Sequence, residues 1–277
     1  MFDNTILLKE KLSEIKNNNY EVPSDISPFD FALVMMKNIG STDPELRDLL
    51  IHRVISSWIM NNVFTNEQLV ELLNINMDNN HLFYKVGEEE NDSVFMRSFC
   101  VLNVGTIIYT HRKNKFLSDD TIRLVKEKLI EYYLKEKDLR GHVDNKGWAD
   151  SASHGADALD EVAQCDSINH NDLIDILKAI KSKVCVNCYT YVDFEDERIT
   201  TAAVSAINRN VLNHSEIADW IRSFKDIPKT GEYHVDFRMI MNVRNFLRSL
   251  YFRLLNEGNS QEVVELIKET LNCIKQY

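Results

Sequence analysis

The segment D43-P-E-L-R-D-L-L-I-H-R-V-I-S-S-W-I59 contains the clearest signals of the fold class. Asp43 is a residue type that caps helix N-termini, and Pro44 suits the first helical position. The apolar residues that follow recur at intervals of three and four, which places them on one side of a helix. They are Leu46, Leu49, Leu50, Val54, Ile55, Trp58 and Ile59. The segment therefore predicts an amphipathic helix with one buried face.

The same helical spacing of apolar residues occurs on both sides of this segment. Helices are predicted to begin near Ile6 and at Phe29, and Thr65 with Gln68 has the pattern of a capping box. Residues 78–92 are polar and irregular, so they are predicted to be a loop. Further helices are predicted over residues 93–112, 118–137, 148–164, 171–183, 194–210, 215–225, 233–256 and 261–276.

The composition also favours helices. The 277 residues include only 8 Gly and 4 Pro, too few for the many hairpins of an all-β protein. Roughly a dozen helices with short links are typical of antiparallel helix pairs. We therefore expect an all-α protein of stacked antiparallel helix pairs, an α-solenoid of HEAT-like character. We expect one elongated domain over residues 1–277, with a possible boundary near residues 138–146.

The net charge of −11 restricts the partners. An acidic surface repels phosphate backbones and anionic lipids, so neither nucleic acid nor a membrane is expected as a partner. The sequence shows no signal peptide and no run of roughly 18 consecutive apolar residues. The 5 Cys lack the spacing of a disulfide framework, which fits a reducing compartment. We expect a cytoplasmic protein that binds a small anionic ligand or another protein.

Residues 140–160, R-G-H-V-D-N-K-G-W-A-D-S-A-S-H-G-A-D-A-L-D, combine turn residues, a predicted helix start, and charged and aromatic side chains in one short segment. On a helix that begins at Trp148, the side chains of Asp150, His154 and Asp157 are neighbours. One imidazole and two carboxylates could hold a divalent metal. His154 or Asp157 could instead transfer protons in catalysis. The alternative is a solvated polar face opposite the apolar residues of the same helix.

The residues just before this predicted helix suggest an anion site. Arg140, His142, Asp144 and Lys146 alternate along the chain, so in an extended segment their side chains point the same way. Arg140 and Lys146 would attract a phosphate or carboxylate to the helix N-terminus beside Trp148, and His142 is a further catalytic candidate. The alternative is a loop held by pairs such as Arg140 with Asp144, with Trp148 in the core.

These residues resemble the hallmark of DUF2785, a bacterial family of domains of unknown function. The hallmark reads approximately R-G-Y-V-x-x-K-G-W-A-H-A-x-A-H-G-A-D-L-L. The matching residues here are Arg140, Gly141, Val143, Lys146, Gly147, Trp148, Ala149, His154, Gly155, Ala156, Asp157 and Leu159. Residues 46–48, 92–99 and 195–198 also resemble family segments. Where the family has Tyr and a first His, this chain has His142 and Asp150, so a two-histidine metal site would be weakened.

The resemblance implies a helical fold and a site at these motifs, but no activity. If the charged segments meet in space, the cations Arg97, Arg140 and Arg198 could form a network that lines a concave groove. The anions of this network would be Asp144, Asp157, Glu195, Asp196 and Glu197. The alternative is a structural ion-pair network that fixes one helix pair against the next.

Three functions remain open at this point. No P-loop, Rossmann glycine pattern, nucleophile elbow or HExxH motif is present. The leading hypothesis is a ligand- or protein-binding module with a charged concave site around residues 140–160 and no bound cofactor. The alternative is a metal-assisted hydrolase that uses Asp150, His154 and Asp157, with Arg140 and Lys146 holding an anionic substrate. A structural scaffold without a small-molecule site is the third possibility.

Overall fold

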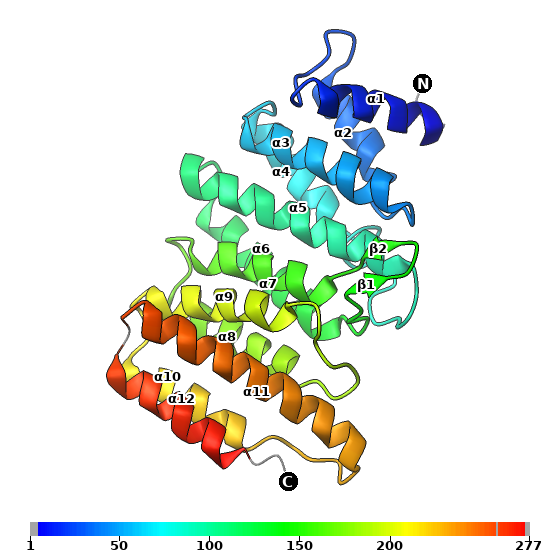
Figure 1. Cartoon of the computed structure of the whole chain (residues 1–277). Helices are drawn as coiled ribbons and strands as arrows, with labels where there is room; N and C mark the ends of the chain where they lie inside the picture. The colour runs from blue at the N-terminus through cyan, green and yellow to red at the C-terminus, as the bar shows by residue number, and fades with distance from the viewer. Residues whose placement is uncertain (1–4, 259, 275–277) are drawn as a thin grey trace. The chain divides into compact units, whose positions relative to one another are not determined.

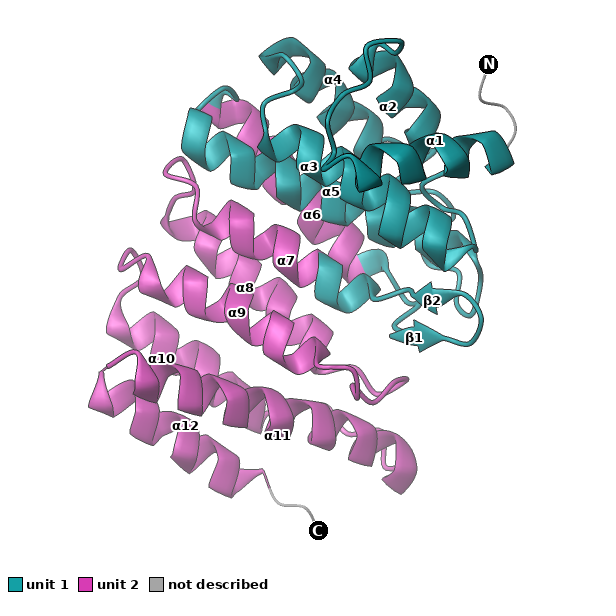
Figure 2. Cartoon of the chain, turned by 45° about the horizontal axis from the view of Figure 1, so that its top comes forward, with its two compact units in different colours: residues 1–118, 135–154 teal, residues 119–134, 155–277 magenta. Residues whose placement is uncertain are grey.

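The computed structural model of the protein describes residues 5–258 and 260–274. Within these residues the chain forms twelve α-helices, a π-helical segment, a 3-10 segment and one two-stranded hairpin (Figure 1). The predicted all-α class is therefore confirmed. The chain divides into two compact units (Figure 2). Unit 1 comprises residues 1–118 and 135–154, and unit 2 comprises residues 119–134 and 155–277.

Unit 1 contains the N-terminal helices and the hairpin. Its elements are α1 (Thr5–Asn17), α2 (Pro28–Met36), the π-helix η1 (Glu45–His52), α3 (Arg53–Met60), α4 (Asn66–Asn76), α5 (Ser93–Asn114), β1 (His142–Val143), β2 (Gly147–Trp148) and the first turn of α7 (Ser151–Ala163). Helix α3 packs against α1 and α5, and α4 packs against α5.

The helix predicted from Asp43 onward is present but changes type along its length. The Asp43 carboxylate accepts hydrogen bonds from the backbone N–H groups of Glu45 at 3.0 Å and Leu46 at 3.2 Å, so it caps the helix start as predicted. The first turns are π-helical, and α3 continues from them. The capping box of Thr65 and Gln68 is also confirmed at the start of α4.

Helix α5 lies in the core of unit 1. Within the described residues it is the one helix long and apolar enough to cross a membrane, but 78% of its apolar window is buried inside the protein. Its residues Val94 and Phe95 are fully buried and pack with Ala149 of the segment after the hairpin. Val143 of β1 packs against the same cluster, so the hairpin is anchored to α5 by apolar contacts.

Unit 2 contains the C-terminal helices. Its elements are α6 (Asp119–Lys135, whose last residue belongs to unit 1), the remainder of α7, α8 (His170–Val184), α9 (Glu195–Asn208), α10 (His214–Arg222), the 3-10 segment η2 (Ser223–Lys225), α11 (Tyr233–Asn256) and α12 (Gln261–Cys273). Helix α9 packs against α8 and α11, and α12 packs against α10 and α11. The last part of the helix predicted over residues 261–276, residues 275–276, lies outside the described residues.

Candidate functional site

The segment between α6 and α7 folds into a β-hairpin. Its strands β1 and β2 pair antiparallel, with His142 opposite Trp148 and Val143 opposite Gly147. Gly147 has a φ of +74°, a conformation that residues with a Cβ rarely adopt. A Cβ at this position would also lie 2.7 Å from the Cβ of Pro44. The glycine is therefore required both by the turn and by the close approach of the segment that precedes η1.

The prediction that a helix begins at Trp148 is wrong. Trp148 lies in β2, and the chain extends beyond it until the Asp150 N–H donates to the Arg140 carbonyl at 3.0 Å. Asp150 then has a φ of +53°, which reverses the chain, and α7 begins at Ser151. The helical spacing of small and apolar residues in α7 happens to extend to Trp148. A strand of two residues is too short to show the alternating pattern that would have distinguished it from the helix.

Trp148 is exposed rather than buried in the core. Its side chain is 40% exposed, and its ring meets the His142 ring edge-to-face at 5.1 Å. The other two tryptophans, Trp58 and Trp220, are 0% and 8% exposed, and their indole N–H groups donate to backbone carbonyls at 2.8 Å. The interpretation of Trp148 as a core residue is therefore contradicted, and its indole is the one in this chain that meets solvent.

Arg47, in the π-helical segment η1, binds the backbone of the hairpin. Its guanidinium donates to the carbonyls of Ser41 at 2.5 Å, Lys146 at 2.5 Å and Trp148 at 3.2 Å. The side chain is fully buried, and its guanidinium lies 4.1 Å from the centre of the Phe95 ring. Burial lowers the pKa of Arg47 to about 10, so it stays charged at neutral pH. A buried cation thus fixes the backbone on both sides of Gly147.

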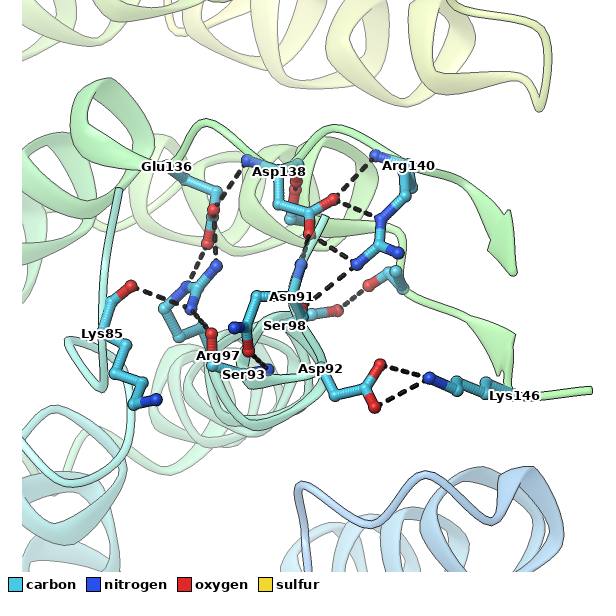
Figure 3. A network of polar contacts seen from close by, with 12 residues as sticks. Lys85, Asn91, Asp92, Ser93, Arg97, Ser98, Glu136, Asp138, Arg140 and Lys146 are labelled. Carbon is cyan, nitrogen blue, oxygen red and sulfur yellow. Dashed lines mark hydrogen bonds and ion pairs between the residues drawn. The ribbon is translucent and has the colours of Figure 1, made fainter. Parts of the chain in front are cut away.

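Arg97 of α5 forms a buried ion pair with Glu136 (Figure 3). The two side chains are 0% and 1% exposed. Nε of Arg97 donates to Oε2 of Glu136 at 2.5 Å, and Nη2 donates to Oε1 at 2.8 Å. The third nitrogen donates to the Ser93 hydroxyl at 2.8 Å and to the carbonyls of Tyr84 at 3.0 Å and Lys85 at 3.3 Å. Arg97 is therefore engaged in joining α5 to two loops.

The cations of the hairpin segment also have acidic partners. Arg140 donates to the Asp138 carboxylate at 2.8 and 2.6 Å and to the Asn91 carbonyl at 3.1 Å. The hydrogen bond to Asp138 raises the pKa of Arg140, although burial opposes this. The Lys146 ammonium lies 2.7 and 2.8 Å from the two carboxylate oxygens of Asp92. Residues 91–93, where the loop meets the start of α5, therefore contact Arg97, Arg140 and Lys146 (Figure 3).

The expected extended segment from Arg140 to Lys146 is not found, because the chain turns between Val143 and Gly147. Arg140 and Lys146 bind separate carboxylates, those of Asp138 and Asp92. The suggested pair of Arg140 with Asp144 is replaced by Arg140 with Asp138, and Asp144 is exposed in the turn. An anion at this site would have to displace a carboxylate that is already in place.

His154 lies in the first turns of α7 and faces α5. Its Nδ1 is 2.8 Å from the Ser98 hydroxyl oxygen, and its ring packs edge-to-face on Phe99 at 5.3 Å. The Ser98 hydroxyl donates its single proton to the Ala149 carbonyl, so His154 Nδ1 is the donor to Ser98. Ser98 is also fully buried. This serine and histidine therefore orient the start of α7 and do not form an accessible nucleophile with its base.

The three predicted metal ligands have other roles. Asp150 precedes α7 and accepts a hydrogen bond from the Ser153 hydroxyl at 3.2 Å. His154 binds Ser98, and Asp157 accepts from Arg198 at 3.3 and 3.4 Å. Across residues 5–258 and 260–274, no group of three or more His, Cys, Asp and Glu side chains is arranged to hold a metal ion.

The remaining predicted residues belong to unit 2. Arg198 of α9 is 60% exposed and pairs with Asp157 of α7. Glu195 is fully buried, and one of its carboxylate oxygens accepts from the Asp193 N–H at 2.7 Å. Asp196 is half-buried, and burial raises the pKa of its carboxyl, an effect to which the charge of Glu197 adds. Glu195 and Asp196 thus sit in the first turn of α9, where a helix favours acidic side chains.

Sequence reasoning missed the partners that fix the site. Arg47 and Asp92 stand out in the sequence only through the family resemblance of residues 46–48 and 92–99, and no motif contains Glu136 or Asp138. One signal was available, since Glu136, Asp138 and Arg140 alternate along the chain. That alternation places an acidic pair directly before the arginine, in the segment that leads into the hairpin.

Comparison with known proteins gives a family and no activity. The family model of DUF2785, described as a protein of unknown function, matches residues 82–252, a span that runs from the loop before α5 into α11. Neither the curated proteins nor the solved structures contain a match to this chain. The matched span includes the hairpin, residues 91–93 at the start of α5, and the start of α9. Since it covers more than half of the 277 residues, the chain belongs to the DUF2785 family.

Proposed function

We propose that this protein is a binding module that uses the hairpin of residues 142–148 to recognise a basic segment of another protein. The observation that carries the proposal is the 40% exposure of Trp148 on a backbone that is fixed on both sides. Tryptophan is the residue type most enriched among those that dominate binding energies at protein interfaces. The site lies within the charged region at residues 140–160 that the sequence singles out.

The rigidity of the hairpin supports this role. The backbone of Trp148 is held by Arg47, and the segment after it is held by the hydroxyl of Ser98, which donates to the Ala149 carbonyl. The hydroxyl of Ser151 similarly donates to the Asp138 carbonyl. Binding loops that are already ordered lose little conformational entropy when a partner docks. A buried network that orders a short hairpin around an exposed indole is therefore suited to recognition.

The local charge favours a cationic partner. Lys146 and Arg140 are each paired with a carboxylate, whereas Asp144 is exposed in the turn. Glu89 and Glu90 are exposed in the adjoining loop, and the charge of Glu90 acts on Arg140. An arginine or lysine of the partner would stack on the Trp148 ring, and the exposed carboxylate of Asp144 in the same hairpin would attract it. The net charge of −11 adds a favourable long-range field.

We also propose that the helices stack as pairs in the manner of an α-solenoid, in a single cytoplasmic domain. The support is that helices two apart in the chain pack together within each unit. This holds for α1 with α3 and α3 with α5 in unit 1, and for α9 with α11 and α10 with α12 in unit 2. Contacts between alternate helices are typical of solenoids, in which successive pairs stack layer on layer.

The test is a titration with a fluorescein-labelled peptide of alternating arginine and serine. We expect saturable binding to the protein and a change in the emission of Trp148, whose indole is the exposed one. Trp148→Ala should raise Kd roughly 30-fold, the effect of a residue that contributes about 2 kcal/mol. Trp148→Phe should retain part of the affinity, because the aromatic face is kept.

Two controls make the test specific. Glu89→Gln with Glu90→Gln should weaken the basic peptide several-fold, whereas Glu10→Gln with Glu71→Gln, which removes two exposed charges elsewhere in unit 1, should not. A peptide of alternating glutamate and serine should not bind. Equal affinity of wild type and Trp148→Ala, or preference for the acidic peptide, would show that the hairpin is not a site for basic segments.

A further inference from the structure

A cavity in unit 2 is separate from the hairpin. It has a volume of about 430 Å³ and is lined by the start of α11, the segment between η2 and α11, and the end of α12. Small-molecule sites in proteins have volumes of about 300–1,000 Å³. The buried side chains of Met239, Ile240 and Ile274 form part of its lining, so a bound molecule would meet an apolar surface.

One side of this cavity is aromatic. Tyr233 and Phe237 are one helical turn apart on α11, and their rings stack with centres 5.9 Å apart and planes inclined by 25°. Both residues line the cavity, and Tyr233 is 59% exposed. Two parallel rings beside an open volume provide a flat surface for a third ring.

The charged part of the lining is basic. Lys225 and Lys229 line the cavity, are exposed and form no salt bridge with another described residue. Among the described lining residues the one carboxylate is that of Asp236. It accepts from the Thr230 N–H at 2.7 Å, the Thr230 hydroxyl at 2.9 Å and the Gly231 N–H at 3.0 Å. Its oxygens are therefore used to fix the loop before α11, although Lys229 still attracts it at longer range.

We propose that this cavity binds an aromatic carboxylate. The ring would lie against Tyr233 and Phe237, and the carboxylate would lie between Lys225 and Lys229. Local charge complementarity selects an anion, because the described lining carries two lysines and one carboxylate, Asp236, that is already hydrogen-bonded. The apolar floor and the stacked rings select an aromatic body over a simple inorganic anion.

The experiment compares naphthoate with naphthylmethanol, which has the same ring system without the charge. Each compound displaces the fluorescent dye anilinonaphthalenesulfonate from the full-length protein. We expect naphthoate to bind several-fold more tightly than naphthylmethanol. Lys225→Gln with Lys229→Gln should raise Kd for naphthoate about fivefold and leave that for naphthylmethanol unchanged. The control pair Lys37→Gln with Lys178→Gln, which removes two exposed lysines outside the cavity, should bind as wild type does.

Alkylation of cysteines locates the bound molecule. Cys273 lines the cavity and Cys188 does not, and both are exposed. Saturating naphthoate should slow the reaction of Cys273 with iodoacetamide and leave that of Cys188 unchanged, as read by mass spectrometry of the wild-type protein. Equal slowing of both thiols, no slowing of Cys273, or unchanged naphthoate affinity in the double lysine variant would overturn the proposal.

Discussion

Replacement of Arg97 by Met tests whether the buried ion pair is a structural support of the hairpin region. The variant leaves the Glu136 carboxylate, which is 1% exposed, without its bidentate partner. The Glu136 carboxylate still accepts from the Asp138 N–H at 3.0 Å, but a backbone hydrogen bond does not balance a buried charge. Breaking a buried pair from one side costs about 3–5 kcal/mol, so we expect a loss of that size in the free energy of unfolding.

A second substitution separates the charge from the packing. In the double variant Arg97→Met with Glu136→Gln, the buried group is neutral and can still accept from the Asp138 N–H. We therefore expect it to be more stable than Arg97→Met by about 2 kcal/mol, since an unpaired buried amide costs less than an unpaired carboxylate. Glu136→Gln alone should cost about 1–3 kcal/mol, because it weakens the hydrogen bonds of Arg97.

Urea denaturation followed by far-UV circular dichroism measures these differences. Equal slopes of unfolding free energy against urea concentration would show that the variants unfold over the same surface. The reasoning is refuted if Arg97→Met costs less than about 1 kcal/mol, the range of an exposed pair. It is also refuted if the effects of the two single substitutions simply add in the double variant.

Two further predictions concern unit 2. Gly155→Ala should destabilise the protein by about 1–3 kcal/mol, because the added Cβ would lie 2.6 Å from Cδ2 of Tyr133. An alanine in an uncrowded helix is instead stabilising, so Ser182→Ala of α8 serves as the comparison in thermal unfolding. An unchanged Tm of Gly155→Ala would contradict the close packing. The pKa of His170 should lie above 6.5, because its Nε2 lies 2.8 Å from the Glu216 carboxylate. The stabilisation of unit 2 by this pair is therefore complete below pH 6.5. It is lost as the pH rises through the higher pKa of the folded state. NMR titration should show the pKa of His170 falling towards 6.5 in Glu216→Gln, and an unchanged value would rule out this pair as the cause.

The helices could be predicted because their signals are local. The spacing of Leu46, Val54 and Trp58, and the capping box of Thr65 with Gln68, lie within one or two turns of the structure they specify. The start of α7 could not be predicted in the same way. It depends on the hydrogen bond from Asp150 N–H to the Arg140 carbonyl, which joins residues ten apart around a turn.

The network that contains Arg97 and Arg140 could be predicted in part from the sequence, but the partners of these two arginines could not. Arg97 and Arg140 do share one network, as the sequence suggested. Their partners Glu136 and Asp138 could not be predicted. An ion pair between residues 97 and 136 produces no regular spacing of residues in either segment of the sequence. The exposure of Trp148 does not follow from the sequence either, because the helix predicted over residues 148–164 includes this residue, whereas it lies in strand β2.

The contact of Arg47 with the hairpin sets a limit on how the chain can be shortened. The family match begins at residue 82, so a fragment trimmed to the matched span would retain Trp148 and lose the side chain that binds its carbonyl. The carbonyls of Lys146 and Trp148 would then lack their charged donor, and the turn would lose the packing of Pro44 against Gly147. The segment before residue 82, which the family match does not include, therefore supports the hairpin. A fragment chosen from the family match alone would lack this support.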